Sequence, residues 1–162
     1  MDQIAYTNDL LNRFEEIFYH ELSQINARCK VELIGTDFLE KNKNIKGKTV
    51  QEVVSSCVDE IKKSGLVKNL TAKVGGKGVL LKLNVNGCIH LPKEHKIKAD
   101  GMEPYMCPIA NMIMGQIIDK LNYLTVYTAR LEVNNAKGEC ELYCAIYENM
   151  DKIGVVSDWS KE

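Results

Sequence analysis

Two pairs of β-rich segments, each joined by a short turn, restrict the possible folds more than any other feature of this sequence. The pairs are 66–74 with 78–86 and 123–133 with 138–148. The second pair is rich in β-branched and aromatic residues, and only Asn134 to Lys137 separate its two members. Such pairs predict two β-hairpins, so we expect an antiparallel sheet.

Three further segments carry helix patterns, over 7–27, 50–63 and 107–122. The first is amphipathic, because apolar residues recur at helical spacing after Thr7, a suitable N-cap. Thr49 and Glu52 fit a capping box at the start of the second. Pro108 suits the first helical position of the third, since its missing N–H needs no partner there.

Helices that occur between hairpins indicate an α+β fold, with an antiparallel β-sheet packed against helices. A short strand is expected at 29–34, and an irregular loop at about 87–106. The length of 162 residues fits a single domain over 1–162.

Charge and hydropathy argue against several classes of protein. No apolar run reaches 18 residues, so we expect no transmembrane helix. The first 30 residues carry acidic side chains and no apolar block, so we expect no signal peptide and a cytoplasmic location. A net charge of −1 argues against binding to nucleic acid, which favours basic surfaces.

Six cysteines are an unusual number for a cytoplasmic chain, in which thiols stay reduced. They indicate core packing, metal binding or redox chemistry. Cys29 and Cys57 are expected in the core. The segment 87–106 concentrates proline and histidine beside Cys88 and Cys107, and long irregular loops are often functional.

Two of the later cysteines have positions that suit a zinc site, which uses thiolates and imidazoles. Cys107 stands at a helix N-terminus, where the helix dipole stabilises a thiolate. Cys140 and Cys144 lie on one predicted strand, with Cα atoms about 13 Å apart, so a single ion cannot bind both unless a bulge interrupts the strand. We assign Cys140, which is nearer the turn, to the site and Cys144 to the core.

The remaining zinc ligands are expected from the irregular segment. Cys88 follows a strand, His90 is two residues further on, and His95 lies seven residues from Cys88. Cys88, Cys107 and Cys140 with either imidazole would complete a tetrahedral site.

The same thiols are compatible with two other functions. A reversible disulfide between two of the second-half cysteines would make the protein a redox sensor. Cys107 could instead be the nucleophile of an enzyme, with His90 or His95 as the base. No motif around Cys107 supports catalysis, so we favour a protein that is not an enzyme.

Four methionines surround the start of the third helix, namely Met102, Met106, Met112 and Met114. Methionine-rich surfaces adapt to apolar ligands, which predicts a pocket for a small apolar molecule. Ordinary core filling is the alternative explanation for these residues.

Cys107-Pro108-Ile109 opens a helix, and Gly138 at a hairpin turn precedes Cys140. In these features residues 80–148 resemble the 4-vinyl reductase (hydrocarbon-binding) domain family, which includes small archaeal proteins and sensory domains of regulators. The resemblance implies helices on an antiparallel sheet, as in small subunits of the Golgi vesicle-tethering complex, and often a homodimer. It also implies binding of a small apolar molecule, and of zinc through the cysteines.

The chain departs from the family at the strand that enters the last hairpin, where members often carry a cysteine. Here Glu132, Val133 and Asn134 occupy that region. Glu132 could serve as an oxygen ligand, since a hairpin centred near residue 136 would place it across from Cys140.

The leading hypothesis is therefore a domain that binds a small apolar molecule and holds zinc near Cys107 and Cys140. A thiol redox sensor, a non-catalytic protein-interaction module and a cysteine-dependent enzyme are the alternatives.

Overall fold

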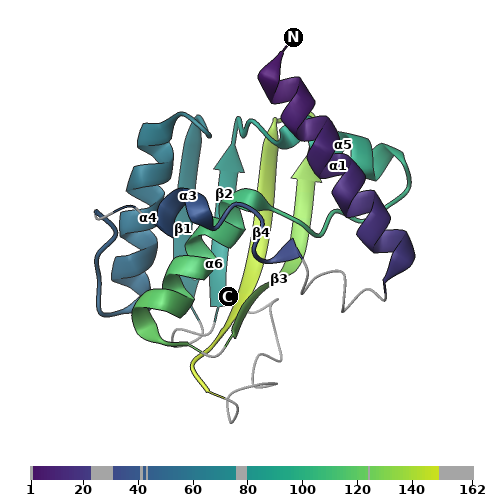
Figure 1. Ribbon diagram of the computed structural model, residues 1–162. Coiled ribbons are helices and arrows are strands. Elements are labelled where there is room, and N and C mark those ends of the chain that lie inside the picture. Colours follow the sequence, from purple (N-terminus) through teal and green to yellow (C-terminus); the bar gives the residue numbers. More distant parts are fainter. Residues whose placement is uncertain are drawn as a thin grey trace.

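Four strands form one antiparallel sheet in the order β1-β2-β4-β3 (Figure 1). They are β1 (Asn69–Gly75), β2 (Leu80–Asn86), β3 (Thr125–Asn134) and β4 (Glu139–Tyr147). β1 pairs with β2, and β3 with β4, as the two predicted hairpins, and β2 lies beside β4 in the middle of the sheet. The predicted α+β class with an antiparallel sheet is confirmed.

The computed structural model describes residues 2–22, 31–40, 42, 44–75, 80–123 and 125–149, with side chains omitted for 125–129. Its helices are α1 (Gln3–Glu21), α3 (Asp37–Glu40), α4 (Val50–Ser64), α5 (Leu91–Ala99) and α6 (Pro108–Leu121). Within these residues, no helix is long and apolar enough to cross a membrane.

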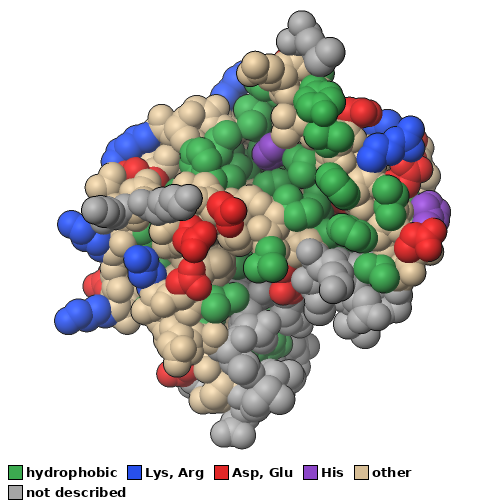
Figure 2. Space-filling model, viewed as in Figure 1, with side chains coloured by type: hydrophobic (Ala, Val, Ile, Leu, Met, Phe, Trp, Pro, Cys, Tyr) green, Lys and Arg blue, Asp and Glu red, His purple; other side chains and the backbone are tan. Residues whose placement is uncertain are grey.

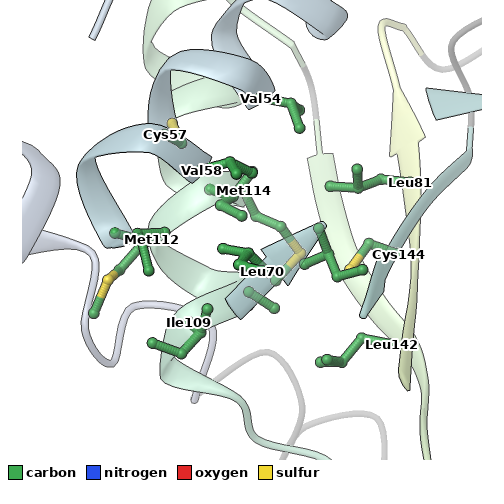
Figure 3. Close-up of a cluster of buried hydrophobic side chains, with 14 of the residues drawn as sticks. Val54, Cys57, Val58, Leu70, Leu81, Ile109, Met112, Met114, Leu142 and Cys144 are labelled. Atoms are coloured by element: carbon green, nitrogen blue, oxygen red, sulfur yellow. The ribbon is translucent and has the colours of Figure 1, made fainter. Parts of the chain in front are cut away.

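The main core lies between the sheet and the two helices α4 and α6. α4 packs on α6 and β1, while α6 also packs on β3. Figure 3 shows side chains from both helices meeting those of the strands, including Val54, Cys57, Met114, Leu81 and Cys144. Cys57 and Cys144 are fully buried, which confirms that both belong to the core. Cys29 lies outside the described residues.

The ends of α4 are set by local sequence, as predicted. The Thr49 hydroxyl accepts from the Glu52 backbone N–H at 3.3 Å, and the Glu52 carboxylate accepts from the Thr49 N–H at 3.2 Å. Gly65 ends the helix with a φ of 79°, a left-handed conformation that costs glycine little.

The segment 87–106 was expected to be a loop, and this prediction is wrong because it contains the nine-residue helix α5. Pro92 lies in the first turn of that helix, where a missing N–H breaks no helical hydrogen bond. Proline therefore marks a helix start here and not an irregular segment.

The strand predicted at 29–34 is also not found where the structure describes it, since Val31 is helical and residues 32–36 form turns. The buried Asn111 side chain of α6 donates hydrogen bonds to the carbonyl oxygens of Val31 and Ile34, at 2.8 and 2.9 Å. These bonds satisfy carbonyl groups that a strand would have paired with another strand.

The first helix begins earlier than predicted, at Gln3 instead of Thr7. Asp2 is the N-cap, and its carboxylate accepts from the Ile4 N–H at 3.0 Å. The described part of α1 ends at Glu21, and the predicted extension over 23–27 lies outside the described residues.

Candidate functional site

Helix α1 turns its polar side toward the rest of the protein and part of its apolar side toward solvent. Its inward strip consists of Asn8, Asn12 and Glu15, which are at most 6% exposed. Its outward strip consists of Tyr6, Leu10, Phe14 and Ile17, which are 41–55% exposed. Amphipathic helices normally place their apolar stripe against the core, so this arrangement is inverted.

The inversion is partial, because residues at the margins of α1 do contact apolar groups. Leu11, Phe18 and Tyr19 are half-buried and pack against a small cluster that contains Val31, Tyr105 and Met106. The helix is therefore attached by a mixed surface with a polar centre.

Glu15 makes the densest set of contacts in the inward strip. One carboxylate oxygen accepts from the backbone N–H groups of Tyr105 and Met106, at 3.0 and 3.1 Å. The other accepts from the Lys93 ammonium at 2.5 Å, and the Tyr105 hydroxyl donates to the Glu15 carbonyl oxygen at 2.7 Å. Charge-assisted bonds of this kind are about twice as strong as neutral ones.

Lys93 on α5 lies between two carboxylates. Its ammonium is 2.5 Å from Glu15 and 2.8 Å from Glu94, and neither Lys93 nor Glu15 has exposed side-chain surface. It also donates to the Met106 carbonyl oxygen at 2.9 Å. Burial raises the pKa of Glu94 to about 7, although the Lys93 charge opposes the shift. The three side chains thus form a buried, hydrogen-bonded charge cluster.

The other end of the inward strip is also held by hydrogen bonds. The Asn8 side chain donates to the Ile89 carbonyl oxygen at 2.8 Å, and its own oxygen lies 3.2 Å from Nδ1 of His90. Burial, with a smaller contribution from the nearby Lys93 charge, lowers the pKa of His90 to about 4, so the imidazole is neutral near pH 7. A neutral ring can donate from Nδ1 to Asn8.

The three cysteines predicted as ligands come from three elements that meet beside α5. Cys88 follows β2, Cys107 is the N-cap of α6, and Cys140 lies on β4. Burial raises the pKa of Cys88 to about 11 and that of Cys140 to about 12, and it raises the pKa of Cys107 well above its usual range. The Glu94 charge is the second contribution to the raised pKa of both Cys107 and Cys140.

These thiols are consequently protonated near neutral pH. At Cys107 the expected stabilisation of a thiolate by the helix N-terminus is outweighed by desolvation and by the Glu94 carboxylate. Protonated buried thiols are weak nucleophiles and weak reductants.

The remaining predicted ligands lie in different environments. His95 on α5 has a buried Nε2 atom without a hydrogen-bond partner in the described structure. Glu132 lies on β3, half-exposed, in an ion pair with Arg130. The strand register pairs Glu132 with Glu141, and Val133 with Cys140, so the prediction that Glu132 lies across from Cys140 is wrong. Because neighbouring residues of a strand face opposite sides, Glu132 points away from the side on which Cys140 is buried.

A metal site is not evident in the described part of the chain, where no three His, Cys, Asp or Glu side chains are grouped to hold an ion. The arrangement therefore does not fit zinc without movement of side chains. Zinc and its predicted ligands Cys88, Cys107, Cys140, His90, His95 and Glu132 remain predictions from the sequence.

The methionines near α6 fill the interior. Met102, Met106, Met112 and Met114 are at most 6% exposed, and Figure 3 shows Met112 and Met114 within the packed region beside α4. A groove of about 960 Å³ does exist elsewhere, and the side chains that line it are mainly polar, including Asn69, Asn84, Glu132 and Glu141. The small apolar ligand remains a prediction.

Comparison with known proteins gives little to add to this geometry. No protein-family model matches the chain, so membership of the 4-vinyl reductase family remains a prediction. No curated protein matches it either. Among solved structures, the chain is similar to a trafficking protein particle complex subunit 3 from Naegleria fowleri, described as covalently bound to palmitic acid. The identity is 13%, the TM-score is 0.40, and the match covers 92% of this chain and 86% of that one. Similarity at this level assigns no function.

Proposed function

We propose that this protein is a non-catalytic protein-interaction module, and that the outward strip of α1 is its docking surface for another protein. One observation carries the proposal: α1 uses its polar side for contacts within the chain and leaves Tyr6, Leu10, Phe14 and Ile17 about half-exposed. Single exposed apolar residues are common on proteins, whereas contiguous apolar patches mark sites of interaction.

The patch extends beyond α1. Phe38 on α3 is 51% exposed and Leu33 is 77% exposed. Figure 2 shows hydrophobic side chains gathered over α1 and continuing across the same face of the molecule toward the region of α3. A partner that covers α1 would therefore find further apolar surface beside it.

The helix cannot relieve this exposure by turning over. Rotation that buried Leu10 and Phe14 would withdraw Glu15 from Lys93, which would leave an ammonium without its closest counter-ion in the interior. Removing one partner of a buried ion pair costs about 3–5 kcal/mol. The polar contacts thus fix the apolar strip in its outward orientation.

The proposal is tested by the size of the assembly that the full chain forms in an extract of its native cells. We expect the wild type to elute well above 18.3 kDa, and the Leu10→Ser/Phe14→Ser double variant to elute as a monomer. The control is Gln51→Ala/Ser55→Ala, which changes exposed residues at the same spacing on α4 and should leave the assembly intact.

Circular dichroism of the double variant should match the wild type and urea unfolding should change little, because both substituted side chains are about half-exposed and lie outside the core. Elution of the wild type as a monomer, in the extract and when purified, would refute the proposal.

A further inference from the structure

We propose that a pocket between α3 and α6 binds the guanidinium group of an arginine side chain, which the partner protein presents beside the apolar residues that cover α1. The choice of a protein as the source of this arginine rests on the proposed function, and the pocket adds the chemistry by which that protein is recognised. Three observations carry the proposal: the charges that line the pocket, a buried amide oxygen without a partner, and the position of the pocket beside the exposed apolar surface.

The pocket has a volume of about 280 Å³ and lies where the segment 33–40 approaches α6. Pockets for drug-sized ligands are larger, at roughly 300–1,000 Å³. The space therefore suits one side chain of a partner. Leu33, Asp37 and Glu40 line it on one side, and Gln116, Ile118 and Asp119 line it on the other.

The charges at this pocket are negative. Asp37, Glu40 and Asp119 are exposed, and none of the described residues that line the pocket is a lysine or an arginine. The ion pairs found in the described part of the chain include none of these three carboxylates. Lys120, the next residue along α6, lines a separate groove. Figure 2 shows acidic side chains gathered over the region of α3 and α6, so this region attracts cations.

Gln116 gives the pocket a buried acceptor. Its side chain is 3% exposed, whereas the other described lining residues are exposed or half-buried, so Gln116 lies at the inner end of the pocket. Its Oε1 atom has no hydrogen-bond partner within the described structure. A buried acceptor without a donor is unfavourable, so an N–H group that enters the pocket would be stabilised by this oxygen.

A guanidinium suits these groups better than an ammonium does. It carries five N–H donors in one plane and no acceptor, so a single group can reach the Gln116 oxygen and carboxylates on both sides. It is also less strongly hydrated than an ammonium, which favours entry into a confined space. The methylene groups of the arginine would pack between Leu33 and Ile118, as long charged side chains do on apolar surface.

The pocket adjoins the exposed apolar surface on which the partner docks. Leu33 belongs to both, since it is largely exposed and also lines the pocket. The exposed Phe38 follows directly after Asp37 on α3. Figure 2 shows hydrophobic and acidic side chains next to one another on this face. A partner that covers the apolar surface therefore brings its neighbouring side chains to the pocket, and charge complementarity selects a basic one.

An NMR titration of the isotope-labelled full chain tests the site. The probe is arginine capped as N-acetyl-arginine-N-methylamide. We expect saturable shifts at the backbone amides of 33–40 and 115–119, with a dissociation constant of about 1–10 mM. Capped citrulline has the same shape without the charge and should give no saturable shift. Capped lysine should bind at least about threefold more weakly, because it has fewer donors.

Variants of the lining residues locate the binding. Glu40→Gln/Asp119→Asn should raise the dissociation constant for capped arginine about tenfold or more, because two charge-assisted hydrogen bonds are weakened. Gln116→Met removes the buried acceptor and should also raise the constant about tenfold. The control is Asp59→Asn, which neutralises an exposed carboxylate on α4 and should leave the constant within about twofold of wild type. Circular dichroism checks that each variant is folded.

The size of the assembly in native extract tests the partner as the source of the arginine. The full chain with Glu40→Gln/Asp119→Asn should elute at a smaller size than wild type, and Asp59→Asn should elute with wild type.

Each contrary result overturns a defined statement. Capped arginine that gives no saturable shift, or capped citrulline that binds equally well, overturns the guanidinium site. The proposed function would still stand in that case if the assembly is lost in Leu10→Ser/Phe14→Ser. An assembly that survives Glu40→Gln/Asp119→Asn but is lost in Leu10→Ser/Phe14→Ser overturns the partner as the source of the arginine.

Discussion

The ammonium of Lys93 lies 2.5 Å from the carboxylate of Glu15, and neither side chain has any exposed surface. This ion pair joins α5 to α1 across 78 positions of sequence. It stands at the centre of the polar surface that attaches α1, so its strength decides whether the outward strip is presented in a fixed orientation.

Removal of one member of this pair should strongly destabilise the protein. Lys93→Met would leave Glu15 and Glu94 buried without the ammonium between them, at a cost of about 3–5 kcal/mol in the free energy of unfolding. Urea denaturation measures this value. Lys63→Met is the matched control, because it breaks the ion pair with Glu60 at the surface, where Lys63 is 71% exposed, and it should change stability little.

The double variant Lys93→Met/Glu15→Met should recover part of the loss, since no unpaired charge from that pair remains. Equal loss of stability in Lys93→Met and Lys63→Met would show that the buried cluster does not hold α1.

Ionisation of Glu94 should weaken the fold as pH rises. Its pKa is raised from 4.5 to about 7 by burial, so the folded state holds this proton more tightly than the unfolded state does. The resulting stabilisation is complete below about pH 4.5 and is lost as pH increases through about 7. Glu94→Gln keeps the neutral form at every pH, and it should therefore be more stable than wild type at pH 8.

The measurement is the difference in free energy of unfolding between Glu94→Gln and wild type from pH 5 to pH 8. The difference removes the contribution of His90, which has the opposite sign. The pKa of His90 is lowered to about 4 by burial, so its contribution is lost as pH falls below about 6.5. A difference that does not vary with pH would contradict the raised pKa of Glu94.

The buried thiols should react slowly in the native state. Cys107 and Cys140 are each 6% exposed, and burial raises the pKa of both, so little thiolate is present at pH 7.5. Alkylation by iodoacetamide, followed residue by residue with peptide mass spectrometry, should be at least a hundredfold slower than in urea. Rapid native labelling of either residue would revive the redox-sensor hypothesis.

Local patterns in the sequence were sufficient for much of the fold. The Thr49–Glu52 capping box and Gly65 bounded α4 correctly, and short turns between β-rich segments gave both hairpins. These features depend on residues within a few positions of one another, which is the information that a sequence pattern contains.

The candidate site depended on contacts that such patterns do not contain. The periodicity of α1 separates two faces but does not say which one turns inward. The polar face is inward because Lys93 on α5 and the backbone N–H groups of Tyr105 and Met106 bind Glu15. The spacing of Asn8, Asn12 and Glu15 over one face was the available signal. The predicted pairing of Glu132 with Cys140 was wrong by one residue of strand register. A shift of one residue moves a side chain to the other side of the sheet.

Because α1 is attached through its polar side, one set of its residues makes the contacts within the chain and another set is left at the surface. Asn8 and Glu15 attach α1 to the rest of the protein, while Leu10 and Phe14 lie outside that hydrogen-bond network. Substitutions in the outward strip could therefore change the strength or choice of partner while leaving folding intact, so that binding specificity could diverge among descendants of this protein faster than their architecture.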